Sequence, residues 1–215
     1  MYSISDAIES GKTILCEKPL ALSYRDARIL CERAAAKGVR TKIGFTFRYS
    51  PVIRRMKELI DGGFVGEPYL FNGFEQNSQF IEPKTPFRWN PDPDSSKLML
   101  GSLEEYAPHL IDLSLWLMGD MKRVLGRMTN FIPERMIRDT GKMMPINIED
   151  ACVWLAEFRS GAQATFQTSF VAVGGYPGIE IRVYGSKGAL MARLVEEFGV
   201  SEALKTATPT SVEFE

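Results

Sequence analysis

The sequence predicts an α/β fold joined to an α+β fold: the remnant of a doubly wound parallel sheet, then a domain with a large, mainly antiparallel open sheet backed by helices. Residues 13–45 follow a strand–helix–strand pattern, which makes parallel neighbours. The chain beyond Asp120 consists mostly of alternating runs joined by short turns, which is typical of hairpins. A helix that is apolar on almost every side lies between these parts.

The first part of the chain holds one complete β-α-β unit. A short helix opens the chain, and Thr13–Cys16 is predicted as a buried strand. Ser23 is the expected N-cap of the next helix, which Gly38 ends, and Thr41–Phe45 is the second strand. Two parallel strands cannot form a stable sheet alone. We therefore expect residues 1–46 to be the last part of a doubly wound domain whose first strands are absent from this sequence.

The second part, residues 47–215, predicts an open sheet with helices on one face. Ser50–Pro51 starts a helix, and Pro68–Gln76 alternates as a strand. Further strands are expected at residues 122–132, 147–158, 162–173, 179–184 and 189–192, and in the closing segment 208–215. The other face of the sheet has enough apolar side chains to pack on a second subunit, so we expect a homo-oligomer.

An apolar helix within the second part holds the only histidine of the chain. Pro108 belongs in a first helical turn, so we expect the helix to begin near Ala107 and to end at Gly119. His109 and Asp112, at i and i+3, then lie on one face. Burying an ionisable pair costs free energy unless the pair has partners or a task. The pair is either a core histidine held by a carboxylate or part of a functional site.

Composition excludes several classes of protein. The net charge is -1 and no basic tract is present, so the sequence indicates neither nucleic-acid nor membrane binding. No apolar run approaches the ~20 residues of a membrane span, and the N-terminus lacks a signal-peptide pattern. The three cysteines have spacings unsuited to zinc. They predict reduced thiols in a cytoplasmic protein without a metal site.

Four motifs, in this order along the chain, resemble one family: Cys16–Ala21 (CEKPLA), Gly44–Pro51 (GFTFRYSP), Gly101–Gly119 and Val183–Leu190 (VYGSKGAL). Together they resemble the glucose–fructose oxidoreductase/inositol dehydrogenase family, also called Gfo/Idh/MocA. The resemblance implies an N-terminal Rossmann domain that binds NAD or NADP, and a C-terminal domain for substrate binding and oligomerisation. It also implies hydride transfer between nicotinamide and a sugar, polyol or related hydroxylated small molecule.

The resemblance further implies the site residues. The lysine of the family's Glu-Lys-Pro motif matches Lys18, so Glu17 and Pro19 are expected beside the cofactor. A second family motif supplies a histidine and two carboxylates, which match His109, Glu105 and Asp112. A neutral imidazole would take the hydroxyl proton, and a lysine would stabilise the alkoxide or relay its proton. A carboxylate one helical turn on would orient the imidazole.

Two interpretations stay open for four further residues. Arg48 lines the cofactor and Tyr49 the substrate, or both simply pair within the chain. Arg88 and Trp89 touch the substrate, or they anchor the proline-rich loop in which they lie.

The sequence departs from the family pattern. Glu105 stands where the family usually has Asp, and Ala107 where it usually has Gly. No Gly-x-Gly-x-x-Gly follows a strand, so the segment that would hold the pyrophosphate is missing. We therefore expect the 215 residues alone neither to bind NADH tightly nor to turn over. The alternatives are an NAD-dependent glycosidase of the same family and a non-catalytic sugar-binding or dimerisation module.

Overall fold

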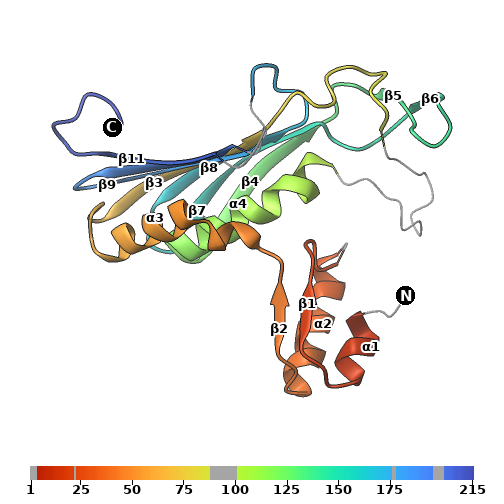
Figure 1. Cartoon of the computed structure of the whole chain (residues 1–215), viewed down its shortest axis with the longest axis horizontal. Helices are drawn as coiled ribbons and strands as arrows, with labels where there is room; N and C mark the ends of the chain where they lie inside the picture. The colour runs from red at the N-terminus through yellow and green to blue at the C-terminus, as the bar shows by residue number, and fades with distance from the viewer. Residues whose placement is uncertain (1–3, 22, 88–100, 176–177, 196–200) are drawn as a thin grey trace. The chain divides into compact units, whose positions relative to one another are not determined.

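The structure is a computed structural model that describes residues 4–21, 23–87, 101–175, 178–195 and 201–215. The chain divides into two units, Met1–Phe47 and Arg48–Glu215. The sequence analysis predicted this boundary one residue earlier, between residues 46 and 47. Among the described residues, the first unit has a two-stranded sheet and the second a seven-stranded one (Figure 1).

The first unit is the β-α-β crossover expected from the sequence. Its elements are α1 (Ile4–Glu9), β1 (Ile14–Cys16), α2 (Tyr24–Ala36) and β2 (Thr41–Ile43). The two strands pair in parallel. Ser23 caps α2, because its hydroxyl accepts a hydrogen bond of 3.1 Å from the Asp26 N–H.

The second unit is built on one twisted sheet with the strand order β11-β10-β9-β3-β8-β7-β4. The strands are β3 (Pro68–Gln76), β4 (Met121–Thr129), β7 (Ala151–Phe158), β8 (Gln163–Ser169), β9 (Gly178–Gly185), β10 (Ala189–Val195) and β11 (Ser201–Ala207). Neighbours are antiparallel except β3 and β8, which are parallel. The predicted fold class is confirmed.

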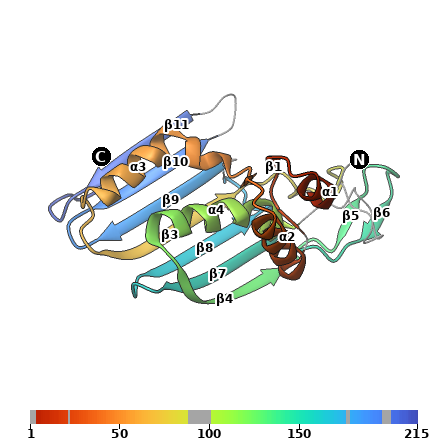
Figure 2. The same cartoon turned by 90° about the horizontal axis from the view of Figure 1, so that it is seen from below.

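Two helices cover one face of this sheet and leave the other face open (Figure 2). They are α3 (Pro51–Asp61) and α4 (Ser102–Met118). The helix-facing side chains of the strands form the core, with the Phe71 ring 5.3 Å from the Phe166 ring. A Cβ atom at Gly73 would lie 3.3 Å from Leu110 of α4 and 3.1 Å from the Phe166 ring. Because glycine has no side chain, α4 packs directly on β3 at this position.

The predicted start of the central helix is wrong. Helix α4 begins at Ser102 and not near Ala107, so Pro108 lies inside it. Pro108 has no N–H to donate to the preceding turn, but Leu110 and Leu113 are almost fully buried against the sheet. The apolar packing of this helix outweighs the lost hydrogen bond.

The first turn of α4 is capped by a carboxylate from another segment. The Leu103 N–H donates to Glu149 Oε1 at 2.8 Å, and the Gly101 N–H donates to Glu104 Oε2 at 3.1 Å. A side chain at Gly101 would overlap the Glu149 carboxylate, so the cap requires glycine there. Burial raises the pKa of Glu149, the Leu103 hydrogen bond opposes this, and Glu104 adds to it.

The C-terminal segment also differs from the prediction. Residues 208–215 do not form a strand; they turn back so that Thr206 and Glu215 exchange two backbone hydrogen bonds of 2.9 and 3.0 Å. The strand at this edge of the sheet is β11, which the sequence analysis did not predict.

A buried ion pair holds a smaller core beside the sheet, where the hairpin of β5 (Glu134–Met136) and β6 (Met143–Pro145) lies. The Arg135 guanidinium is fully buried; it donates to the Phe80 carbonyl at 2.6 Å and to the Asp150 carboxylate. The second oxygen of Asp150 accepts from the Phe131 and Ile132 N–H groups at 2.7 and 2.8 Å. The Arg135–Asp150 ion pair thus joins three chain segments, at Phe80, at residues 131–135 and at Asp150.

We predict that Arg135→Leu lowers the free energy of unfolding by about 3–5 kcal/mol, because it leaves the Asp150 carboxylate buried without its cation. Urea denaturation measures the loss. The control is Arg123→Leu, which removes an exposed arginine paired with Glu157 and should cost less than about 1 kcal/mol. Equal losses in the two variants would contradict the prediction.

We also predict that Glu149→Gln makes stability less dependent on pH. The pKa of the wild-type carboxyl is raised in the folded protein, so its contribution is full below about 4.5 and is lost as pH rises through the raised value. Glutamine keeps an acceptor for the Leu103 N–H and carries no charge beside Glu104. Thermal unfolding at several pH values should show Glu149→Gln at least as stable as wild type near neutral pH. Glu149→Ala should lose about 1 kcal/mol with the cap.

Candidate functional site

The polar face of α4 is the centre of the candidate site. His109 and Asp112 are only 8% and 7% exposed, although both carry ionisable groups. Glu105 lies one turn before His109 and is half-buried, and Trp116 lies one turn after Asp112. The predicted placement of His109 and Asp112 on one helix face is confirmed.

The Asp112 carboxylate is held by an arginine from outside the helix. Arg48 Nε donates to Asp112 Oδ2 and a terminal guanidinium nitrogen donates to Oδ1, both at 2.6 Å. The same guanidinium lies 5.4 Å from the centre of the Trp116 ring. Arg48 therefore pairs within the chain, and its expected place beside the cofactor stays a prediction. The sequence did not predict Asp112 as its partner.

Arg48 is itself on a fixed turn. It belongs to the 3-10 helix η1 (Thr46–Tyr49), directly before the N-cap Ser50 of α3. The Ser50 hydroxyl accepts from the Ile53 N–H at 3.3 Å and donates to Glu202 of β11 at 2.8 Å. Glu202 also accepts from the Val52 N–H at 3.2 Å. The turn is thus held from α3 and from the sheet edge.

A second buried carboxylate lies beneath α4. Glu75 is 8% exposed, and it lies on β3 between two contacts with the helix. Gly73 meets Leu110, as described above, and Asn77 Nδ2 donates to the Tyr106 hydroxyl at 2.6 Å. Glu75 therefore faces the stretch of α4 that includes His109. The sequence analysis missed it, although a Glu on a strand that alternates Phe71, Gly73, Glu75 toward the core is a visible signal.

The other predicted site residues belong to the first unit, to η1 or to the segment outside the described residues. Glu17 is exposed, and Lys18 and Pro19 are half-buried after β1 in the first unit. Tyr49 of η1 is 52% exposed. Arg88 and Trp89 lie outside the described residues. Arg48 of η1 reaches the face of α4 that carries His109 and Asp112. Lys18 belongs to the first unit.

The described residues of the first unit do not form a phosphate cradle. Gly11 and Gly38 have positive φ angles of 68° and 66°. They follow the C-terminal ends of α1 and α2, whereas a phosphate binds at the N-terminal end of a helix. The Glu17 carboxylate covers Gly44, where an added Cβ would lie 3.0 Å from both oxygens. A carboxylate repels a phosphate, and cradles are made of free N–H groups. These residues therefore do not fit the pyrophosphate of a dinucleotide.

Metal and membrane sites are not seen in the part of the chain that the structure describes. There, no three His, Cys, Asp or Glu side chains are grouped to hold a metal ion. No described helix has both the length and the apolar character to cross a membrane.

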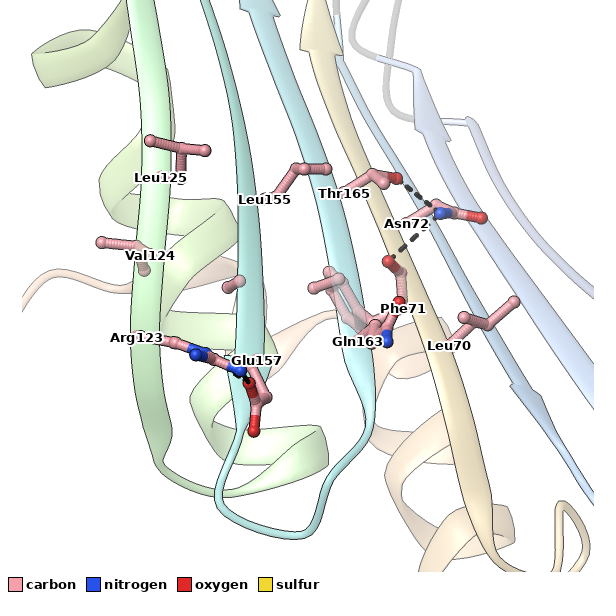
Figure 3. Close-up of a pocket in the computed structure, with 12 residues that line it drawn as sticks. Leu70, Phe71, Asn72, Arg123, Val124, Leu125, Leu155, Glu157, Gln163 and Thr165 are labelled. Carbon is pink, nitrogen blue, oxygen red and sulfur yellow. Dashed lines mark hydrogen bonds and ion pairs between the residues drawn. The ribbon is translucent and has the colours of Figure 1, made fainter.

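The open face of the sheet carries a hollow of about 410 Å³ that is separate from the His109 face of α4. Leu125, Leu155, Thr165 and Asn72 form one cross-strand row over β4, β7, β8 and β3 (Figure 3). Leu125 is 74% exposed and Leu155 56%. At the rim, Arg123 pairs with Glu157. This surface combines exposed leucines with a charged pair on the same two strands, a mixture that protein interfaces also contain.

Two family models match the chain. The model described as GFO/IDH/MocA C-terminal domain matches residues 53–191. The model described as oxidoreductase family, NAD-binding Rossmann fold, matches residues 2–45. The family expected from the sequence motifs is therefore confirmed.

Proteins with known activities and a solved structure agree with these models. The chain is 25% identical to levoglucosan dehydrogenase of Pseudarthrobacter phenanthrenivorans over 197 residues, which cover 86% of this chain and 50% of that protein. It is 29% identical to inositol 2-dehydrogenase 3 of Saccharopolyspora erythraea over 187 residues, covering 86% and 48%. The crystal structure of an oxidoreductase domain protein from Kribbella flavida matches with a TM-score of 0.81 and 30% identity, covering 99% and 58%.

The chain spans about half the length of these two dehydrogenases. Within that half, both units are matched: the first by the cofactor-binding model and the second by the C-terminal-domain model. The chain belongs to the Gfo/Idh/MocA family of oxidoreductases.

Proposed function

We propose that this chain carries the substrate-binding half of an NAD(P)-dependent oxidoreductase that acts on a sugar, a polyol or a related hydroxylated small molecule. The observation that carries the proposal is that His109 and Asp112 are buried on one face of α4, and that Arg48 binds Asp112, in a chain of this family. An ionisable pair buried on an otherwise apolar helix is costly unless it has a task.

His109 is the proposed base. Oxidation of an alcohol requires the hydroxyl proton to leave, and a neutral imidazole titrates near working pH. Glu105 and Asp112 are the supporting carboxylates on the same helix face. Lys18, by the family resemblance, would stabilise the developing alkoxide or relay its proton. Tyr49, half-exposed on η1, is the proposed substrate contact of the second unit.

The substrate class follows from the kind of site and from the relatives. The names of the two dehydrogenases state that they act on levoglucosan and on inositol, both uncharged and rich in hydroxyl groups. A small set of fixed polar groups on a mostly apolar helix suits such a ligand, because each hydroxyl needs a defined partner. We propose an uncharged polyhydroxylated substrate.

The open sheet face is the proposed surface for a second copy of the chain. Leu125 and Leu155 form the apolar end of the row, and a two-fold axis at this end would pack them against the same leucines of a second copy. Arg123 and Glu157 at the rim add charges of both signs for the same purpose.

The activity is tested on the full chain with the first half of the cofactor domain of levoglucosan dehydrogenase fused before Met1. We expect this fusion to form NADH from NAD and a sugar or polyol, and His109→Ala to lower kcat/KM by about 10²–10⁴-fold. The control is Asp120→Ala, at an exposed position beyond α4, which should keep full activity.

Two outcomes would overturn the proposal. If the fusion binds NADH but oxidises no sugar or polyol, the chain is a binding module. If it releases a reducing sugar without net NADH formation, the chain belongs to an NAD-dependent glycosidase. The unfused chain should show no micromolar affinity for NADH, because the described residues of its first unit do not fit a pyrophosphate.

Leu155→Lys should weaken self-association of the full chain by about tenfold or more, because a charge replaces an exposed apolar side chain that lines the hollow of the open face. Sedimentation velocity over a range of concentrations measures this. Val212→Lys makes the same change at a fully exposed position, and it should leave the oligomer intact. A wild-type chain that is monomeric at all concentrations would refute the proposed interface.

A further inference from the structure

We propose that Arg48 is a positioning residue that acts through Asp112 to disfavour protonation of His109. The inference rests on the proposed function in one respect: it gives His109 the task of accepting a proton. Neither the family match nor the sequence motifs assign this role to Arg48.

The geometry makes Asp112 the partner of Arg48. Both carboxylate oxygens accept from the guanidinium at 2.6 Å, in the bidentate arrangement that gives the strongest carboxylate–arginine contact. Asp112 is 8% exposed at its side chain and Arg48 39%. The carboxylate is therefore largely shielded from water, and the arginine is the charge that compensates it.

Several contacts keep the guanidinium in this place. The Trp116 ring lies 5.4 Å from it, one helical turn beyond Asp112. The backbone that carries Arg48 continues into Ser50, whose hydroxyl bonds with Glu202 of β11 at 2.8 Å. Arg48 is thus a fixed part of the second unit and not a loose surface side chain.

The electrostatic consequence concerns His109, one turn from Asp112. A carboxylate at this spacing stabilises an imidazolium and makes the histidine a poorer base at neutral pH. A guanidinium bound to the same carboxylate offsets its field at the imidazole. Glu105, one turn before His109 on α4, and the buried Glu75 on β3 are also acidic. Arg48 is the cation bound to Asp112 on this face of α4, so its removal should favour imidazolium formation.

Because the chain has one histidine, its ring protons give a single set of NMR signals that can be titrated without cofactor or substrate. We expect Arg48→Gln to raise the His109 pKa by about one unit. Asp112→Asn should lower it, because Arg48 then acts alone. The double variant Arg48→Gln/Asp112→Asn should return close to the wild-type value. A residue with only a structural role would not produce these opposite shifts.

Arg55→Gln is the matched control. It removes an arginine from an exposed pair with Glu58 on α3, and the His109 pKa should not change. If Arg48→Gln does not fold, Arg48→Lys keeps the charge and loses the bidentate contact, and it should raise the pKa by a smaller amount. An unchanged pKa in Arg48→Lys and Asp112→Asn overturns the inference. This result is independent of enzyme activity, so failure of the proposed oxidoreductase function would be seen separately, in the fusion assay.

Discussion

The ion pair between Arg48 and Asp112 is the contact on which the second unit's functional face depends. It joins the turn that leads into α3 to the middle of α4, two elements that otherwise touch the sheet separately. A carboxylate this deeply buried needs a fixed cation, because an uncompensated one would be destabilising by several kcal/mol, about 3–5. Because Asp112 requires a cation beside it, the ion pair fixes the position of Arg48 relative to α4, and with it the surroundings of His109.

Much of the fold could be predicted because its signals are local. Ser23 and Ser50 cap helices as expected, since a cap depends on residues within one turn. The alternation along Pro68–Gln76 predicted β3 because period-two burial is built into a strand. The start of α4 was mispredicted because proline is expected in a first helical turn, whereas burial of Leu110 and Leu113 keeps Pro108 inside a longer helix. Strand β11 was missed because Ala, Leu and Lys favour helices, and only pairing with β10 makes it a strand.

In the candidate site, too, only the features that depend on local spacing could be predicted. The helical period alone places His109 and Asp112 on one face. Their partners were not accessible in this way, because Arg48 is separated from Asp112 by 64 residues and Glu75 reaches the helix only through the packing at Gly73. Sequence motifs identified the side chains that could do chemistry. The tertiary structure adds the charged partner of Asp112.

The alternation of the strands separates two tasks onto two faces of one sheet. On β3, Phe71, Gly73 and Glu75 face the helices, whereas Leu70 and Asn72 face the open side. Substitutions such as Leu155→Lys therefore change the open face without touching α4, and substitutions at Arg48 leave the open face unchanged. If association nevertheless altered the titration of His109, the coupling would have to pass through the backbone of β3, which Gly73 places in direct contact with α4.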